Sequence, residues 1–188
     1  MEEDLVVNDN DFRYFNYSKL RDMKDRYHIY GISYFYGDYL SFPIGTYSIG
    51  LNKKDIKFIK NITGIYFSKT VKDYASYNPP FKYLSKLEEI DLGDSQITFL
   101  YKDLFKNCKK LKTVILPNYM EVIEEEMFIN CKNLTTVIGK GIKHIKNNAF
   151  KNCKKLEKVE FSTNVILEEK ALDGIKNKEN ILSLINSK

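Results

Sequence analysis

Apolar residues recur along the middle of the chain in a pattern that repeats every 22 or 23 residues. Phe105, Phe128 and Phe150 each begin the same group, Phe-x-Asn-Cys, and lie 23 and then 22 residues apart. A Leu stands six residues after each Phe, and a Val stands three residues after each Leu. Repetition at a period of about 20 to 30 residues is typical of a solenoid, in which each repeat packs on the next.

Each repeat holds one segment with the two-residue alternation of a β-strand. The clearest segment has Leu111, Val114 and Leu116, and the last two share one face of a strand because they are two residues apart. Later in each repeat, one apolar residue precedes another by four positions, and this spacing predicts a short helical turn. These pairs are Ile123 and Met127, Ile145 and Ala149, and Leu167 and Ala171.

The Asn of the repeated group predicts a special backbone conformation. In the next unit its place is taken by Gly174, and Asn and Gly share a tolerance of positive φ, which predicts a left-handed cap at Asn107, Asn130 and Asn152. The Cys that follows is replaced by an apolar residue in the flanking units, so it is expected to be a small buried hydrophobe. Three Cys at equivalent positions do not form a disulfide framework and fit a reducing compartment.

The whole pattern, Leu-x-x-Val-x-Leu-Pro…Ile…Ala-Phe-x-Asn-Cys, resembles the BspA-like leucine-rich repeat family from about Ile62 to Ile175. The resemblance implies an α/β fold, a right-handed leucine-rich-repeat solenoid with a parallel sheet on its concave face. It also implies protein binding, often as a surface adhesin. Two departures stand out: Gly139 replaces a strand Leu, and the third and fourth full units lack a counterpart of Pro117.

The chain divides into an N-terminal cap (1–52), the repeats (53–175) and a C-terminal cap (176–188). Residues 9–26 have an apolar stripe that predicts a capping helix. Further on, Gly37-Asp38 suits a hairpin turn between two aromatic runs. Alternatively, Ile29, Ile32 and Tyr34 have the strand spacing of a degenerate first repeat. Both interpretations predict a strand over residues 29–36.

The sequence gives opposing indications of the cellular compartment. Hydrophobic residues make up 43% of the chain, enough for a continuous core, and no apolar run is long enough to span a membrane. The acidic start, Met-Glu-Glu-Asp, is unlike a secretory signal peptide. The start and the free thiols favour the cytoplasm, whereas the family resemblance favours the cell surface. We expect a monomer.

Catalytic motifs are missing from the sequence. It has two His, and it has no Cys-x-x-Cys, His-Glu-x-x-His, Gly-x-Ser-x-Gly or phosphate-binding Gly loop. His144 is expected to be exposed and without a role, and Glu124, Glu125 and Glu126 to form a solvated turn. We therefore expect no enzyme, no cofactor and no metal.

A run of lysines offers a second possible function. The net charge is +5, and lysines recur just after each Cys, where they are expected to line one ridge. They are Lys109, Lys110, Lys132, Lys154 and Lys155. A ridge without Arg or interleaved aromatic residues argues against nucleic acid. Binding of a polyanion or an anionic surface is the alternative to protein binding.

The outward positions of the predicted strands are the candidate partner-binding residues, because strand residues alternate between two faces. They are Tyr66, Glu89, Asp91, Thr113, Ile115, Thr136, Ile138, Lys158 and Glu160. Exposed Ile115 and Ile138 would form an apolar centre with an acidic rim, as in a protein interface. Alternatively, β-branched residues are present only because they suit strands, or another segment covers them.

Overall fold

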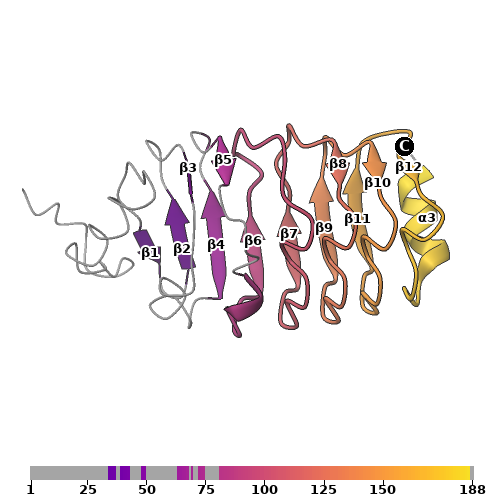
Figure 1. Cartoon of the computed structure of the whole chain (residues 1–188), viewed down its shortest axis with the longest axis horizontal. Helices are drawn as coiled ribbons and strands as arrows, with labels where there is room; N and C mark the ends of the chain where they lie inside the picture. Colours follow the sequence, from indigo (N-terminus) through magenta and orange to yellow (C-terminus); the bar gives the residue numbers. More distant parts are fainter. Residues whose placement is uncertain are drawn as a thin grey trace, which may run out of the picture.

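The computed structural model describes residues 81–186 without a gap and, before them, residues 63–67, 69, 72–74 and three strand segments within 34–49. Most strands belong to a seven-stranded sheet that runs along the length of the molecule (Figure 1). In spatial order these strands are β1 (Tyr34–Tyr36), β2 (Tyr39–Phe42), β4 (Gly64–Phe67), β6 (Glu89–Asp91), β7 (Thr113–Ile115), β9 (Thr136–Gly139) and β11 (Lys158–Phe161).

From β2 onward, neighbouring strands of this sheet are parallel and in register. In β6, β7, β9 and β11 the second residue is buried and the residues before and after it face outward, as expected for a strand. The inward residues form one buried column of Ile65, Ile90, Val114, Val137 and Val159. The parallel sheet, which the family resemblance implied, and the inward position of the Val of each Leu-x-x-Val-x-Leu segment, which the spacing predicted, are both confirmed.

The first two strands confirm the predicted hairpin. β1 and β2 pair antiparallel, with Tyr36 opposite Tyr39. The parallel neighbour of β4 is β2, which pairs Leu40 with Ile65. Tyr34, the described residue of the alternative degenerate repeat, therefore lies in an antiparallel strand, and Ile29 and Ile32 lie outside the described residues. The predicted helix at 9–26 lies outside the described residues.

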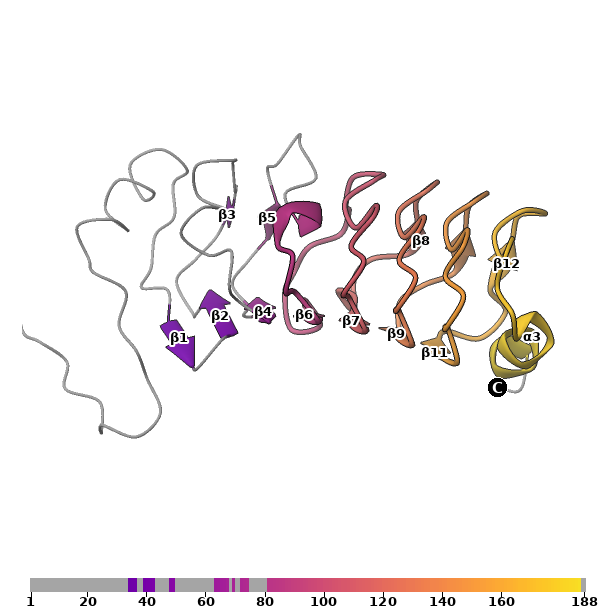
Figure 2. The ribbon, with the colours of Figure 1, turned by 90° about the horizontal axis from the view of Figure 1, so that it is seen from below.

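Short strands occupy the side of the molecule away from the large sheet (Figure 2). β8 (Val122–Ile123), β10 (His144–Ile145) and β12 (Ile166–Leu167) form a parallel three-stranded sheet, and β3 (Ser48–Ile49) pairs with β5 (Asp73–Tyr74). The helical turn predicted to start at Ile123 was wrong, because that residue lies in a strand. A tight turn follows it, with Met127 N donating to Glu124 O at 3.3 Å.

A stack of phenylalanines fills the interior beneath the turns. The rings of Phe105 and Phe128 lie 5.0 Å apart at 2°, and those of Phe128 and Phe150 lie 5.1 Å apart at 2°. Phe81, from the 3-10 helix η1 (Phe81–Tyr83), extends the stack at 5.5 Å. The repeated Phe therefore marks the position at which successive turns contact each other through their rings.

The asparagines of the repeated group adopt the predicted left-handed conformation. Asn107, Asn130 and Asn152 have φ of 62°, 63° and 63°, and the equivalent Gly174 has φ of 75°. Their side chains also form a ladder, since Asn130 Nδ2 donates to Asn107 Oδ1 at 3.0 Å and Asn152 Nδ2 donates to Asn130 Oδ1 at 2.9 Å. Asn thus supplies both the backbone conformation and a link between turns.

All three cysteines are buried and free, as predicted. The thiol of Cys131 donates to Phe105 O at 2.9 Å, and that of Cys153 donates to Phe128 O at 3.1 Å. Burial raises the pKa of Cys131 to about 12 and also raises the pKa of Cys153. These thiols are consequently protonated at neutral pH and belong to the core.

The glycine that departs from the repeat has a packing reason. A Cβ at Gly139 would lie 2.7 Å from Ile142 Cγ1 and 3.2 Å from Leu116 Cδ1. Ile142 therefore fills the space that a strand Leu or Phe occupies in the other repeats.

The last turn is covered by α3 (Lys178–Asn186), which packs against β11 and buries Ile181 and Ile185. Within the part of the chain that the structure describes, no helix has the length and apolar character needed to cross a bilayer.

The sheet face as the candidate binding site

The outer face of the large sheet holds all nine residues predicted from the strand pattern. In Figure 2 the strands lie along the inner side of a shallow arc, so this face is gently concave. Strand pairing arranges the nine in two columns, one of Glu89, Thr113, Thr136 and Lys158, and one of Tyr66, Asp91, Ile115, Ile138 and Glu160. Lys158 is exposed and the other eight are half-buried.

The centre of the face is apolar. Ile115 and Ile138 stand directly opposite each other on β7 and β9, with Thr113 and Thr136 beside them. Neighbouring groups partly cover Ile115, since a Cβ on Gly93 would lie 2.9 Å from its Cγ2. The two Ile side chains are therefore half-exposed, which is less than the full exposure expected from the sequence, but they still present a joined apolar surface.

One end of the face is acidic. Tyr66 Oη donates to Asp94 Oδ2 at 2.7 Å, and Asp91 Oδ1 accepts from Gly93 N at 2.9 Å. Burial, the hydrogen bond to Asp94 and the negative charges nearby raise the pKa of Tyr66 to about 12. The pKa of Asp91 is raised by burial and by the charges of Asp94 and Glu89, although the Gly93 N–H opposes the rise. These groups concentrate negative charge next to the apolar centre.

The opposite end of the face is electrically balanced. Lys158 Nζ lies 2.8 Å from Glu160 Oε1 on the same strand. The acidic rim expected on both sides of the centre is thus present around Asp91 and is neutralised at Glu160.

Two residues of the acidic end were missed by reasoning from the strand pattern alone. Asp94 follows β6 and receives the Tyr66 hydroxyl, while Asn118 follows β7 and donates from Nδ2 to Gly93 O at 2.9 Å. Both lie in the loops that leave the sheet, and the available signal was the group Gly93-Asp94, whose residue types favour turns.

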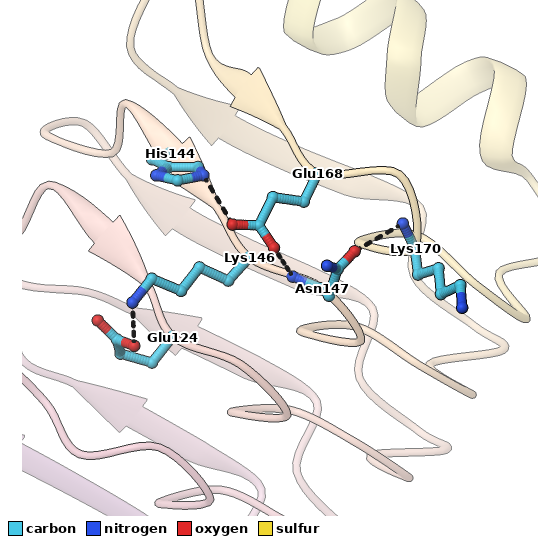
Figure 3. Close-up of polar contacts among 6 residues, drawn as sticks. All are labelled: Glu124, His144, Lys146, Asn147, Glu168 and Lys170. Atoms are coloured by element: carbon cyan, nitrogen blue, oxygen red, sulfur yellow. Dashed lines mark hydrogen bonds and ion pairs between the residues drawn. The ribbon is translucent and has the colours of Figure 1, made fainter.

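The far side of the molecule is held by ion pairs between successive turns (Figure 3). Lys146 Nζ donates to Glu124 Oε2 at 2.7 Å, and Glu168 accepts from Asn147 N at 2.8 Å. Glu168 also lies 3.2 Å from Nε2 of His144, which is half-buried, so the expectation that His144 is exposed and without a role was wrong.

The predicted solvated turn at Glu124–Glu126 connects to both neighbouring repeats. Glu124 pairs with Lys146 of the following turn, and Glu126 pairs with Lys106 of the preceding turn at 2.8 Å. Of the three, Glu125 is exposed, and Glu124 and Glu126 are half-buried. Among the described residues, no three His, Cys, Asp or Glu side chains gather as they would around a metal ion.

Comparison with solved structures places this fold among leucine-rich repeat proteins. A leucine-rich cell surface protein of Faecalibacterium prausnitzii is 20% identical with a TM-score of 0.52, covering 73% of this chain and 35% of its own. Internalin C2 of Listeria monocytogenes is 16% identical with a TM-score of 0.50, covering 70% of this chain and 54% of its own. The chain therefore spans about a third of the first protein and about half of the second.

No curated protein sequence matches the chain. A family model for the BspA type leucine-rich repeat region does match, with six copies over residues 56–179. This match covers more than half of the sequence and coincides with the stacked turns. Together with the parallel sheet and the Phe-x-Asn-Cys turns, it shows that the chain belongs to the BspA type leucine-rich repeat family.

Proposed function

We propose that the protein is a non-catalytic binding module that captures a protein partner on the outer face of its large sheet. The leucine-rich repeat fold suits a role in protein interaction, because a stacked sheet offers a long surface whose residues vary independently of the core. Adhesion at a cell surface is the specific form of this role that we propose, by analogy with the cell surface protein named above.

The observation that carries the proposal is the apolar pair Ile115 and Ile138 beside an acidic end. Outward strand positions that face water are ordinarily polar, and adjacent half-exposed Ile residues suit a contact surface. Glu89, Asp91 and Asp94 supply negative charge at one side, so the expected partner presents an apolar side chain followed by a basic one.

The test is the double variant Ile115→Lys with Ile138→Lys. The wild-type chain is first used to capture partners from native extract, and affinity for the purified partner is then measured. We expect the double variant to bind at least tenfold more weakly, about 1.4 kcal/mol, with little change in melting temperature.

The matched control is Phe99→Lys with Ile166→Lys, which changes two apolar residues that are 51% and 65% exposed away from the sheet face. This control should bind like the wild type. If the Ile115 and Ile138 double variant keeps full affinity, the partner binds elsewhere. If it unfolds, the two Ile belong to the core and the proposal fails.

A further inference from the structure

Lysines occupy most of the outer positions in the tight turns that lead into the strands of the large sheet. Each of four turns is closed by a backbone hydrogen bond across two outer residues, as from Leu111 N to Cys108 O at 3.2 Å and from Leu134 N to Cys131 O at 3.0 Å. The outer pairs are Ser85-Lys86, Lys109-Lys110, Lys132-Asn133 and Lys154-Lys155. We call the six lysines of these turns the lysine ridge, and all six are exposed.

The stacking of the turns sets the spacing of the lysine ridge. Successive turns follow the strands, which lie about 4.8 Å apart in a sheet. Asn133 Nδ2 donates to Lys109 O at 2.7 Å and so holds two of these turns together. In Figure 1 the turns that enter β6, β7, β9 and β11 line up along the lower edge of the sheet. Six positive charges therefore lie in a row about 15 Å long.

Within the described residues, the six ridge lysines make no ion pair and are gathered in successive turns, whereas other lysines without an ion pair, such as Lys140 and Lys170, lie outside these turns. Five lysines outside the ridge each lie within ion-pair distance of a carboxylate, namely Lys106, Lys112, Lys143, Lys146 and Lys158. Of the acidic residues close in sequence, Glu88 pairs with Lys112 and Glu157 is exposed beside Lys158.

This arrangement is unfavourable for the protein by itself. Like charges stacked on neighbouring turns repel one another, and the fold could place Glu at some of these exposed positions, as it does elsewhere. A linear polyanion lying along the ridge would remove the repulsion and release its own counterions.

We propose that the lysine ridge binds a linear sulfated polysaccharide. The turn positions contain no Arg for bidentate contacts with phosphate and no aromatic residue on which a base could stack, which disfavours nucleic acid. Lysine is a compact point charge that pairs with sulfate without demanding a particular geometry. The ridge lies at the edge of the sheet and does not include the residues of the proposed protein-binding face.

The experiment measures binding of a heparin oligosaccharide to the full chain between 50 and 300 mM salt. The ridge variant carries Lys109→Gln, Lys132→Gln and Lys154→Gln. The control variant carries Lys112→Gln, Lys143→Gln and Lys146→Gln, so it loses the same charge from lysines that are already paired. We expect the wild type to bind less tightly as salt rises, the ridge variant to bind at least tenfold more weakly with a smaller salt dependence, and the control to stay within twofold of the wild type.

Other outcomes would overturn the proposal. Equal losses in the two variants would mean that only net charge matters, and binding by the wild type that is absent or insensitive to salt would exclude the site. Tighter binding of a single-stranded DNA of equal charge, or of vesicles with anionic lipid, would assign the ridge to that ligand instead. A variant with Arg at the same three ridge positions keeps the charge, so it should bind like the wild type, and its failure to do so would also exclude the site.

Discussion

The interior of the molecule and the outer face of its large sheet follow opposite rules. Inside, one position is Phe in four successive turns, from Phe81 to Phe150. Outside, the column that begins at Tyr66 changes chemistry at almost every step, through Asp91 and Ile115 to Glu160. Stacked turns offer each interior side chain the same space, whereas a side chain on the outer face meets only its neighbours and whatever binds there. Residues that repeat from turn to turn in this protein are therefore those that pack in the interior. The columns that vary, on the outer face of the sheet, are the places to look for binding.

The strongest way to break the interior is to remove a ring from the middle of the stack. Phe128 is fully buried with a ring on each side, so Phe128→Ala should lower the free energy of unfolding by about 3–5 kcal/mol. Phe99→Ala, at a position 51% exposed, should cost less than about 0.5 kcal/mol. Denaturant unfolding measures both, and similar costs for the two would contradict the comparison.

Two substitutions in the asparagine ladder test the contributions of backbone conformation and side-chain hydrogen bonding separately. Asn130→Ala should cost about 2–3 kcal/mol, because Ala is strained at a φ of 63° and the two amide hydrogen bonds are lost. Asn130→Gly relieves the strain and should recover about 1 kcal/mol of that loss. If the Gly variant were no more stable than the Ala variant, the conformation would not be the reason for Asn at this position.

Neighbouring residues of β9 test the two faces directly. Val137 is fully buried, so Val137→Thr should cost about 1–3 kcal/mol through its buried hydroxyl. Ile138 faces outward and is half-buried, so Ile138→Thr should cost less than about 1 kcal/mol. Thermal unfolding of the two variants measures both losses of stability. Equal losses would show that Ile138 belongs to the core.

The thiols give the smallest effect, seen in the dependence of stability on pH. The pKa of Cys131 is about 12 in the folded protein and about 8.5 in an unfolded chain, so the folded state keeps a proton that the unfolded chain loses. Stability from this group is complete below about pH 8.5 and falls as pH rises towards 12. Between pH 8.5 and 9.5 the loss should be about 1 kcal/mol.

Cys131→Ser is the control for that experiment, because its hydroxyl does not titrate in this range and can donate to Phe105 O. Subtracting its pH profile from that of the wild type isolates the thiol. A difference between the two profiles that does not change with pH would show that the thiol is not protected by burial. Native labelling with a thiol reagent should be slow for the same reason.

The sequence by itself determined the repeat, the inward and outward positions of each strand, and the left-handed asparagines. These features depend on the spacing of residues within one repeat and on the conformational range of Asn and Gly, both of which are local properties. The same logic placed the nine outward residues of the sheet, since alternation along a strand needs no knowledge of distant contacts.

Only the tertiary structure decided how successive turns meet. Ile123 and Met127 have a helical spacing, yet Ile123 lies in a strand because its neighbour Ile145 offers backbone groups to pair with. The hydrogen bond from Tyr66 to Asp94 spans 28 residues, and the unpaired state of the lysine ridge depends on where the carboxylates of adjacent turns come to lie. Such contacts join residues that are far apart in sequence, and their geometry is fixed only once the repeats are stacked.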